Sequence, residues 1–194
     1  MKRLPSEIYD FAFRGLLTEE ALDKAGRPHP NVAAAPEQEL AQLSALDSLD
    51  ETYVTAARRM SIVYTAVAAF ENSARKLIES VLLEEIGADW WDKSVSQSIR
   101  KRAESRREEE AKIRWHGQRG GSPVDYTDMS DLGNIIRNNW PQFEDYIPSI
   151  EWAASIFSVI ERSRNVIMHS GELSREDVAR LGINIRDWVK QVGV

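Results

Sequence analysis

Cysteine is absent from the 194-residue sequence, and histidine occurs only three times, at His29, His116 and His169. The absence of cysteine excludes disulfide scaffolds, thiolate metal clusters and cysteine nucleophiles, and it is typical of a reducing compartment. So few histidines argue against a metal site, and we expect no metal or other cofactor. No apolar run approaches the ~20 residues of a membrane-spanning helix, and a signal-peptide core is lacking. We therefore expect a cytoplasmic protein without a membrane partner.

Positive charge is also scarce, because 25 Lys and Arg face 31 Asp and Glu, for a formal net charge of −6. This balance excludes a generic nucleic-acid coat, but residues 100–119 carry eight Lys and Arg against four Asp and Glu. Any polyanion partner, such as RNA, would therefore be held at a local patch and not over the whole surface. The arginines of this candidate RNA-binding patch are Arg100, Arg102, Arg106, Arg107, Arg114 and Arg119.

The same basic stretch has a second interpretation. Residues of opposite charge lie four positions apart in it, which is typical of an exposed helix with weak ion pairs along its own surface. Both interpretations stay open at this point. The pairs expected from this spacing are Arg100 with Glu104, Arg106 with Glu110, and Glu108 with Lys112.

Strand signals are nearly absent, and apolar residues recur at steps of three or four, which is the helical period. Stretches with Gly and Pro at 26–36 and 117–123 are typical of a linker and a loop. We therefore expect an all-α protein, with an N-terminal helix and Pro-rich linker at 1–35 and an up-and-down helical bundle at 36–194. The expected helices cover residues 6–22, 52–86, 94–115, 129–138, 148–169 and 174–192, the last opened by a capping box at Ser174.

An arginine interrupts the apolar face of the helix expected at 148–169. Arg164 lies only about 20° around the axis from Phe157 and about 40° from Ile160. Burying an unpaired guanidinium costs several kcal/mol, so Arg164 needs a partner or a wet cleft. Glu161, one turn earlier, is the local candidate for that partner.

A second pair of opposite charges lies on the apolar side of the helix expected at 52–86. Glu71 and Arg75 are four residues apart, the spacing at which helical side chains meet. We interpret them as a structural pair, with a second role as supporting partners of Arg164 left open.

Two further polar residues follow Arg164 on the same helix. Asn165 comes next, and His169 lies in the last turn, where the helix dipole favours a protonated imidazole. Metal-free RNA cleavage needs a base for the 2′-hydroxyl, a charge that stabilises the phosphorane, and an acid for the 5′-oxygen. These three residues are therefore the candidate catalytic residues. The alternative is structural, with Arg164 paired to Glu161 and His169 capping the last carbonyls.

The segment from Arg164 to His169 resembles the Arg-x4-6-His signature of the HEPN superfamily (higher eukaryotes and prokaryotes nucleotide-binding). Its context resembles the HEPN domain of the Swt-one type over about residues 50–194, and residues 1–45 lie outside the likeness. The segments that carry it are FENSAR at 70–75, GADWW at 87–91, DYTDMSDL at 125–132, IIRNNW at 135–140, and the motif followed by LS at 173–174.

This resemblance implies a helical bundle that dimerises through the motif helix, so that Arg and His of both subunits form one metal-independent ribonuclease site. Carried onto this chain, Arg164 stabilises the transition-state phosphate, Asn165 orients the substrate, and His169 acts as acid or base. Two proton transfers also favour a homodimer, because a twofold axis supplies the second motif histidine. Superfamily toxins silenced by nucleotidylation have Tyr two residues after the His. Gly171 stands there, so we do not expect this control.

The sequence therefore leads to the hypothesis of a homodimeric endoribonuclease that acts on RNA, in the role of a toxin or defence effector. Many HEPN domains are inactive adaptors, so the alternative is a non-catalytic module that dimerises or binds a protein or a nucleotide. A third hypothesis is that the chain is a subunit whose activity requires a regulatory protein partner.

Overall fold

The computed structural model describes residues 14, 18 and 37–193, which form helices, turns and loops without a strand. The chain divides into two compact units, residues 1–51 and residues 52–194. In the first unit, α2 (Glu37–Leu43) and the 3-10 helix η1 (Leu46–Ser48) bury none of their side chains. The helix expected at 6–22 lies outside the described residues except for Arg14 and Thr18, which are both helical.

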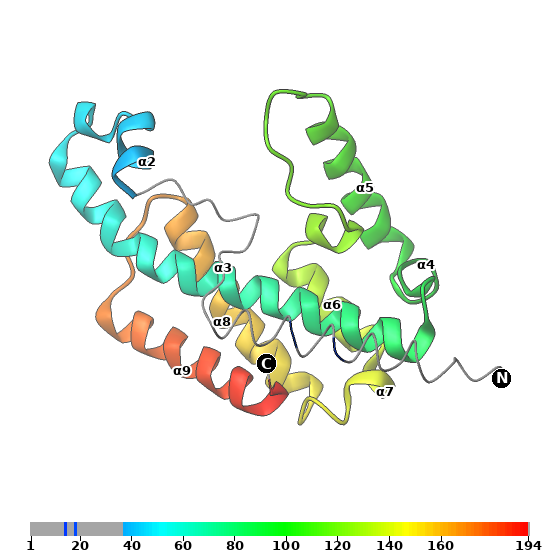
Figure 1. Ribbon diagram of the computed structural model, residues 1–194. Coiled ribbons are helices and arrows are strands. Elements are labelled where there is room, and N and C mark those ends of the chain that lie inside the picture. Colours follow the sequence, from blue (N-terminus) through cyan, green and yellow to red (C-terminus); the bar gives the residue numbers. More distant parts are fainter. Residues whose placement is uncertain (1–13, 15–17, 19–36, 194) are drawn as a thin grey trace. The chain divides into compact units, whose positions relative to one another are not determined.

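The second unit confirms the all-α class and most of the expected helices (Figure 1). The expectations for 52–86, 129–138, 148–169 and 174–192 agree with the structure to within two residues at each end. None of the described helices is both long and apolar enough to cross a membrane. The elements are α3 (Glu51–Ile86), α4 (Trp90–Ser94), α5 (Gln97–Ala111), η2 (Pro123–Tyr126), α6 (Met129–Asn138), α7 (Trp140–Phe143), α8 (Ile150–Met168) and α9 (Arg175–Val192).

The helix expected at 94–115 is wrong in its bounds. The observed helix begins later, at Gln97, and ends earlier, at Ala111. Val95 has an extended backbone (φ −93°, ψ 130°), which separates α4 from α5. Only Ile99 and Ala103 of α5 are buried. Beyond Ala103 the helix has no apolar face to pack, and it ends at Ala111, four residues before Trp115.

The core of the second unit forms where α8 contacts α6 on one side and α9 on the other (Figure 1). Phe70 of α3, Phe157 of α8 and Trp188 of α9 meet there edge to face, with ring centroids 5.3 to 5.7 Å apart. Trp188 is fully buried. This aromatic cluster fixes α8 against α3, and α8 is the helix that carries the candidate motif.

Candidate functional site

Arg164 of α8 pairs across the bundle with a carboxylate of α3. Its Nε lies 3.5 Å from Oε2 of Glu71, and the side chain of Glu71 is only 12% exposed. Glu161 forms no ion pair in the described part of the chain, so the local partner expected for Arg164 is corrected to Glu71. The side chain of Arg164 remains 36% exposed. The guanidinium is thus held by a buried carboxylate while it still reaches solvent.

Glu71 is itself fixed by Arg75, which confirms the pair expected four residues apart on this helix. Nη2 of Arg75 donates to Glu71 and also to the backbone carbonyl of Thr127, at 3.0 Å. Nη1 donates to Oδ1 of Asn72 at 2.9 Å. One carboxylate therefore serves two arginines, and Arg75 connects it to the segment that precedes α6.

The start of α6 carries a second cluster of charges, which is built by its capping residues. Asp128 is the N-cap, and it exchanges side-chain to backbone hydrogen bonds with Asp131. Asp131 is fully buried and pairs with Arg102 and Arg106 of α5. Arg106 also reaches Asp128 at 2.8 Å and the carbonyl of Tyr126 at 2.7 Å. The capping box thus aims two carboxylates at α5.

Partial burial by itself raises the pKa of Asp128. The hydrogen bonds that this carboxylate accepts from the Asp131 N–H, the Ser130 hydroxyl and Arg106 outweigh burial, and they lower the pKa below its ordinary value of 3.8. A carboxylate with such a pKa stays ionised at neutral pH. Asp128 and Arg106 therefore both carry their charges at neutral pH.

The two clusters join through the backbone at 127–128 into one continuous arrangement, which we call the charged seam. It links α8, α3, the start of α6, and α5, so it ties the motif helix to the rest of the bundle. The members of the charged seam are Arg164, Glu71, Arg75, Asp128, Asp131, Arg102 and Arg106.

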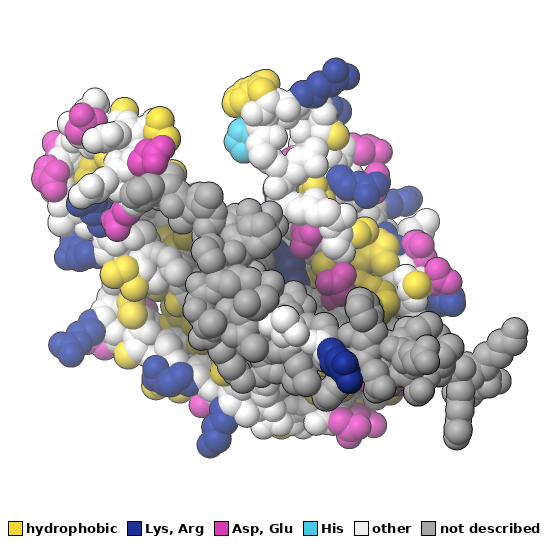
Figure 2. Space-filling model, in the orientation of Figure 1, with side chains coloured by type: hydrophobic (Ala, Val, Ile, Leu, Met, Phe, Trp, Pro, Cys, Tyr) yellow, Lys and Arg dark blue, Asp and Glu magenta, His cyan; other side chains and the backbone are white. Residues whose placement is uncertain are grey.

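The arginines of the candidate RNA-binding patch do not form one free basic surface. Arg102 and Arg106 belong to the charged seam, and Arg114 is exposed without an ion pair among the described residues. Figure 2 shows Lys or Arg and Asp or Glu side chains interleaved around α4 and α5. The remaining pairs are Arg100–Asp92 (2.7 Å), Arg107–Glu104 (2.9 Å) and Arg119–Glu110 (2.6 Å).

The ion pairs expected from the spacing on this helix are wrong, because each basic residue pairs with a different carboxylate. Arg100 bonds Asp92 of α4 instead of a residue on its own helix, and Arg106 reaches across to the start of α6. Lys112 pairs with Glu109 at 2.6 Å. Arg106 leaves its local partner because the buried Asp131 needs compensating charge.

His169 lies where α8 ends, and its neighbours close the helix in a Schellman motif. The N–H of Ser170 donates to the carbonyl of Ile167 at 3.0 Å, and the N–H of Gly171 donates to that of Val166 at 2.8 Å. The left-handed residue of the motif is Ser170 (φ 61°). A non-glycine residue in this conformation is costly, and sequence patterns did not reveal it.

The side chains of Asn165 and His169 are free to contact a substrate at this helix end. Both residues are exposed, and neither side chain has a hydrogen bond or ion pair among the described residues. The backbone N–H of His169 donates to the carbonyl of Asn165 at 3.2 Å. The structure therefore holds the backbone at both residues and leaves their polar groups available.

We predict opposite effects of two substitutions at this turn. A Cβ on Gly171 would lie 2.7 Å from Cγ1 of Val166 and 2.9 Å from its carbonyl oxygen, so Gly171→Ala should destabilise the protein by about 1–3 kcal/mol. Ser170→Gly removes the left-handed strain and should stabilise it by about 0.5–1 kcal/mol. Urea unfolding followed by circular dichroism measures both changes, and a neutral Gly171→Ala variant would contradict the close approach.

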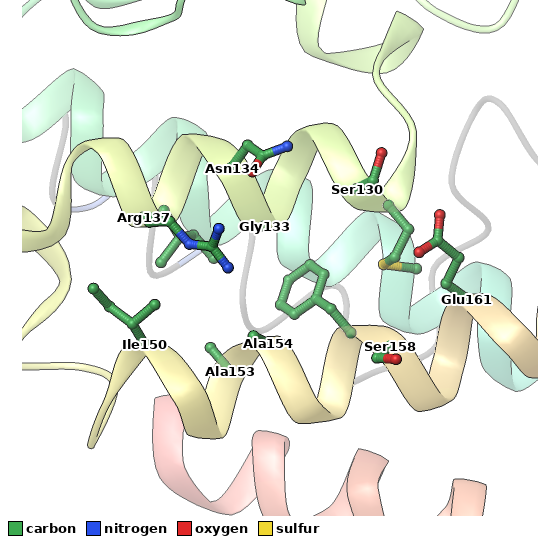
Figure 3. A pocket seen from close by; sticks show the side chains of 12 residues that line it. Ser130, Gly133, Asn134, Arg137, Ile150, Ala153, Ala154, Ser158 and Glu161 are labelled. Carbon is green, nitrogen blue, oxygen red and sulfur yellow. The ribbon is translucent and has the colours of Figure 1, made fainter.

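Two hollows flank the motif on α8. A pocket of about 180 Å³ lies between α6 and α8, and Glu161 and Arg137 are among the residues that line it (Figure 3). A groove of about 750 Å³ lies between the N-terminal half of α3 and the end of α8, where Met168 and Ser170 line it. The neighbours of His169 on both sides thus form a wall of the groove.

An all-α bundle whose motif helix ends in Arg-Asn-x-x-x-His belongs to the class of HEPN domains. A family model described as Swt1-like HEPN matches residues 65–193, about two-thirds of the chain, and the chain belongs to this family. No curated protein and no solved structure gives a significant match. Membership indicates a ribonuclease-like or nucleotide-related role. The match begins inside α3, so the part of α3 that lines the groove precedes it.

Proposed function

We propose that this protein is a metal-independent endoribonuclease that acts as a homodimer. Arg164, Asn165 and His169 of each subunit contribute to one shared site. Cleavage by the 2′-hydroxyl leaves a 2′,3′-cyclic phosphate and a 5′-hydroxyl. A cytoplasmic toxin or defence effector is the setting that such an activity suits.

One observation carries this proposal, and it is the state of Arg164. A purely structural arginine on a core-facing stripe is sealed by its partner, whereas this side chain keeps 36% of its surface exposed beside the buried Glu71. A guanidinium fixed on one side and open on the other is preorganised to stabilise charge on a phosphate. Asn165 and His169 follow it on the same helix with unengaged side chains.

The chemistry assigns one proton transfer to each of two histidines. His169 of one subunit takes the proton of the 2′-hydroxyl, whose oxygen attacks phosphorus as the bond to the 5′-oxygen breaks. The leaving 5′-oxygen receives a proton from His169 of the partner subunit. Arg164 stabilises the charge that builds on the phosphorane, and Asn165 orients the phosphate by a hydrogen bond.

The groove at the end of α8 supports a second copy of the chain as the partner. Its walls are mostly apolar, and Tyr53, Tyr64 and Met168 on them are exposed. A groove lined by exposed aromatic and apolar side chains suits contact with another protein surface. A twofold axis through this region brings the two motif ends together, which the two proton transfers require.

The ion pairs along α5 favour a second candidate function. Five of the six arginines of the candidate RNA-binding patch have carboxylate partners, which leaves little free positive charge for an RNA backbone. A non-catalytic HEPN module that binds a protein or a nucleotide would have this surface. It would bind its partner without cutting RNA.

A cleavage assay separates the two functions. We expect the purified protein to cut a mixed RNA pool equally well with and without EDTA, and its mass in solution to be that of a dimer. The 3′ ends of the products should be resistant to phosphatase until acid opens a cyclic phosphate, and the 5′ ends should accept phosphate from a polynucleotide kinase. RNA that stays intact at micromolar protein would overturn the enzyme and favour the binding module.

A further inference from the structure

We propose that the pocket between α6 and α8 binds a guanine base of the RNA, next to the phosphate at Arg164. This inference rests on the proposed function, since it assigns the base recognition of that same site. The pocket has about 180 Å³ of free space. Buried Met129 and Phe157 line its apolar part, and polar side chains stand around them (Figure 3).

A glycine inside α6 keeps the pocket open. Glycine in the middle of a helix is unfavourable, and it is usually explained by a close packing contact. Gly133 has no such contact, because a Cβ built on it meets no atom within 4 Å. Internal packing therefore does not account for Gly133. The space that its missing side chain leaves belongs to the pocket, and the small side chains of Ala153 and Ala154 face it from α8.

Four of the polar side chains that line this space have no partners of their own. Asn134, Arg137, Ser158 and Glu161 form no hydrogen bond or ion pair in the part of the chain that the structure describes. In Figure 3 the guanidinium of Arg137 lies between the two helices, and the carboxylate of Glu161 points toward the start of α6. The pocket thus offers a free donor group near one end and a free acceptor group near the other.

The pocket is continuous with the proposed catalytic helix face. It is lined on α8 by residues at steps of three or four that end at Glu161. Arg164 and Asn165 come three and four residues later, so they extend the same stripe by one turn. A base in the pocket and its phosphate at Arg164 therefore lie along one face of α8.

Guanine fits this pattern of groups better than the other bases. Its O6 and N7 accept two hydrogen bonds from one arginine, and its N1–H and N2–H₂ donate two to one carboxylate. Adenine, cytosine and uracil lack either the paired acceptors or the paired donors. Splayed-out RNA bases are recognised in this way, by apolar contact with the base face and hydrogen bonds at its edges.

Calorimetric titration with the four nucleoside 3′-monophosphates tests the site without requiring cleavage. We expect guanosine 3′-monophosphate to bind at least tenfold more tightly than the other three. Gly133→Leu fills the pocket and should weaken that binding at least tenfold, with a melting temperature that does not fall. Glu161→Gln should remove the preference for guanine. Gly182→Leu, at a glycine of α9 outside the pocket, is the matched control and should bind as the wild type does.

The possible results test the guanine pocket and the proposed ribonuclease activity independently. Tight guanosine binding that Gly133→Leu removes supports the pocket even if RNA is never cut. RNA cleavage without nucleotide binding supports the proposed ribonuclease activity and contradicts guanine binding in the pocket. Preference for another base overturns the assignment to guanine, and binding that Gly133→Leu does not change overturns the site.

Discussion

Replacing His169 with alanine is expected to lower the rate of RNA cleavage by about 10²- to 10⁴-fold, the contribution of a positioned general acid or base. If each site uses one histidine from each subunit, the substitution removes both at once. The loss should then lie at the upper end of this range. Initial rates on a labelled RNA, with saturating and with low substrate, measure it.

The fold should survive this change, because the structural contacts of His169 are made by its backbone. The backbone N–H bonds the carbonyl of Asn165, and alanine keeps that bond. The imidazole is exposed, so its removal leaves no cavity. We therefore expect an unchanged helical circular-dichroism spectrum and a melting temperature within about 2 °C of the wild type.

His116→Ala is the matched control for this experiment. His116 is also exposed, but it lies in the loop after α5, where Nδ1 is 2.9 Å from the carbonyl oxygen of Gly117. Its removal should leave cleavage unchanged. Equal rates for His169→Ala and the wild type would show that His169 takes no part in the reaction.

Sequence periodicity and capping residues predicted most of this fold. The apolar steps of α3 and α8 are visible along the chain because each helix packs one continuous stripe against its neighbours. Ser174 also predicted the start of α9, and its side chain accepts a hydrogen bond from the N–H of Asp177. Such local signals need no knowledge of which helices meet. They can therefore be recognised from the sequence alone.

The candidate site could be predicted only in part, because its partners come from other elements. The position of Arg164 on a core-facing stripe indicated that its charge needs compensation, and the sequence left open a supporting role for Glu71. Spacing alone favoured Glu161, which the structure places in a pocket instead. The left-handed conformation of Ser170 could not be predicted either, because serine rarely adopts it and no local sequence signal marks it.

A second large effect is expected in the charged seam, at Asp131. Replacing both Arg102 and Arg106 with methionine should lower the free energy of unfolding by about 3–5 kcal/mol, the usual cost of leaving a buried charge unpaired. Asp131 is fully buried, and these two arginines are its ion-pair partners among the described residues. Arg106→Met also leaves the carbonyl of Tyr126 without its donor. Urea unfolding measures the loss.

Two further variants assign that loss to the buried charge. Arg107→Met with Arg114→Met removes the same number of charges from exposed positions, and it should change stability by less than about 0.5 kcal/mol per site. Adding Asp131→Asn to the Arg102 and Arg106 double variant should restore part of the stability. An asparagine oxygen can still accept the hydrogen bond from the N–H of Asp128, but it carries no charge.

This comparison also tests whether the arginines of α5 bind RNA or hold the start of α6. If the arginines of α5 serve to hold the start of α6, the Arg102 and Arg106 variant loses stability, and the Arg107 and Arg114 variant binds RNA as the wild type does. If the stretch is an RNA-binding patch, the Arg107 and Arg114 variant stays folded but loses affinity, and the salt dependence of binding becomes weaker. The ion pairs of Arg102 and Arg106 with a fully buried carboxylate lead us to expect the first result.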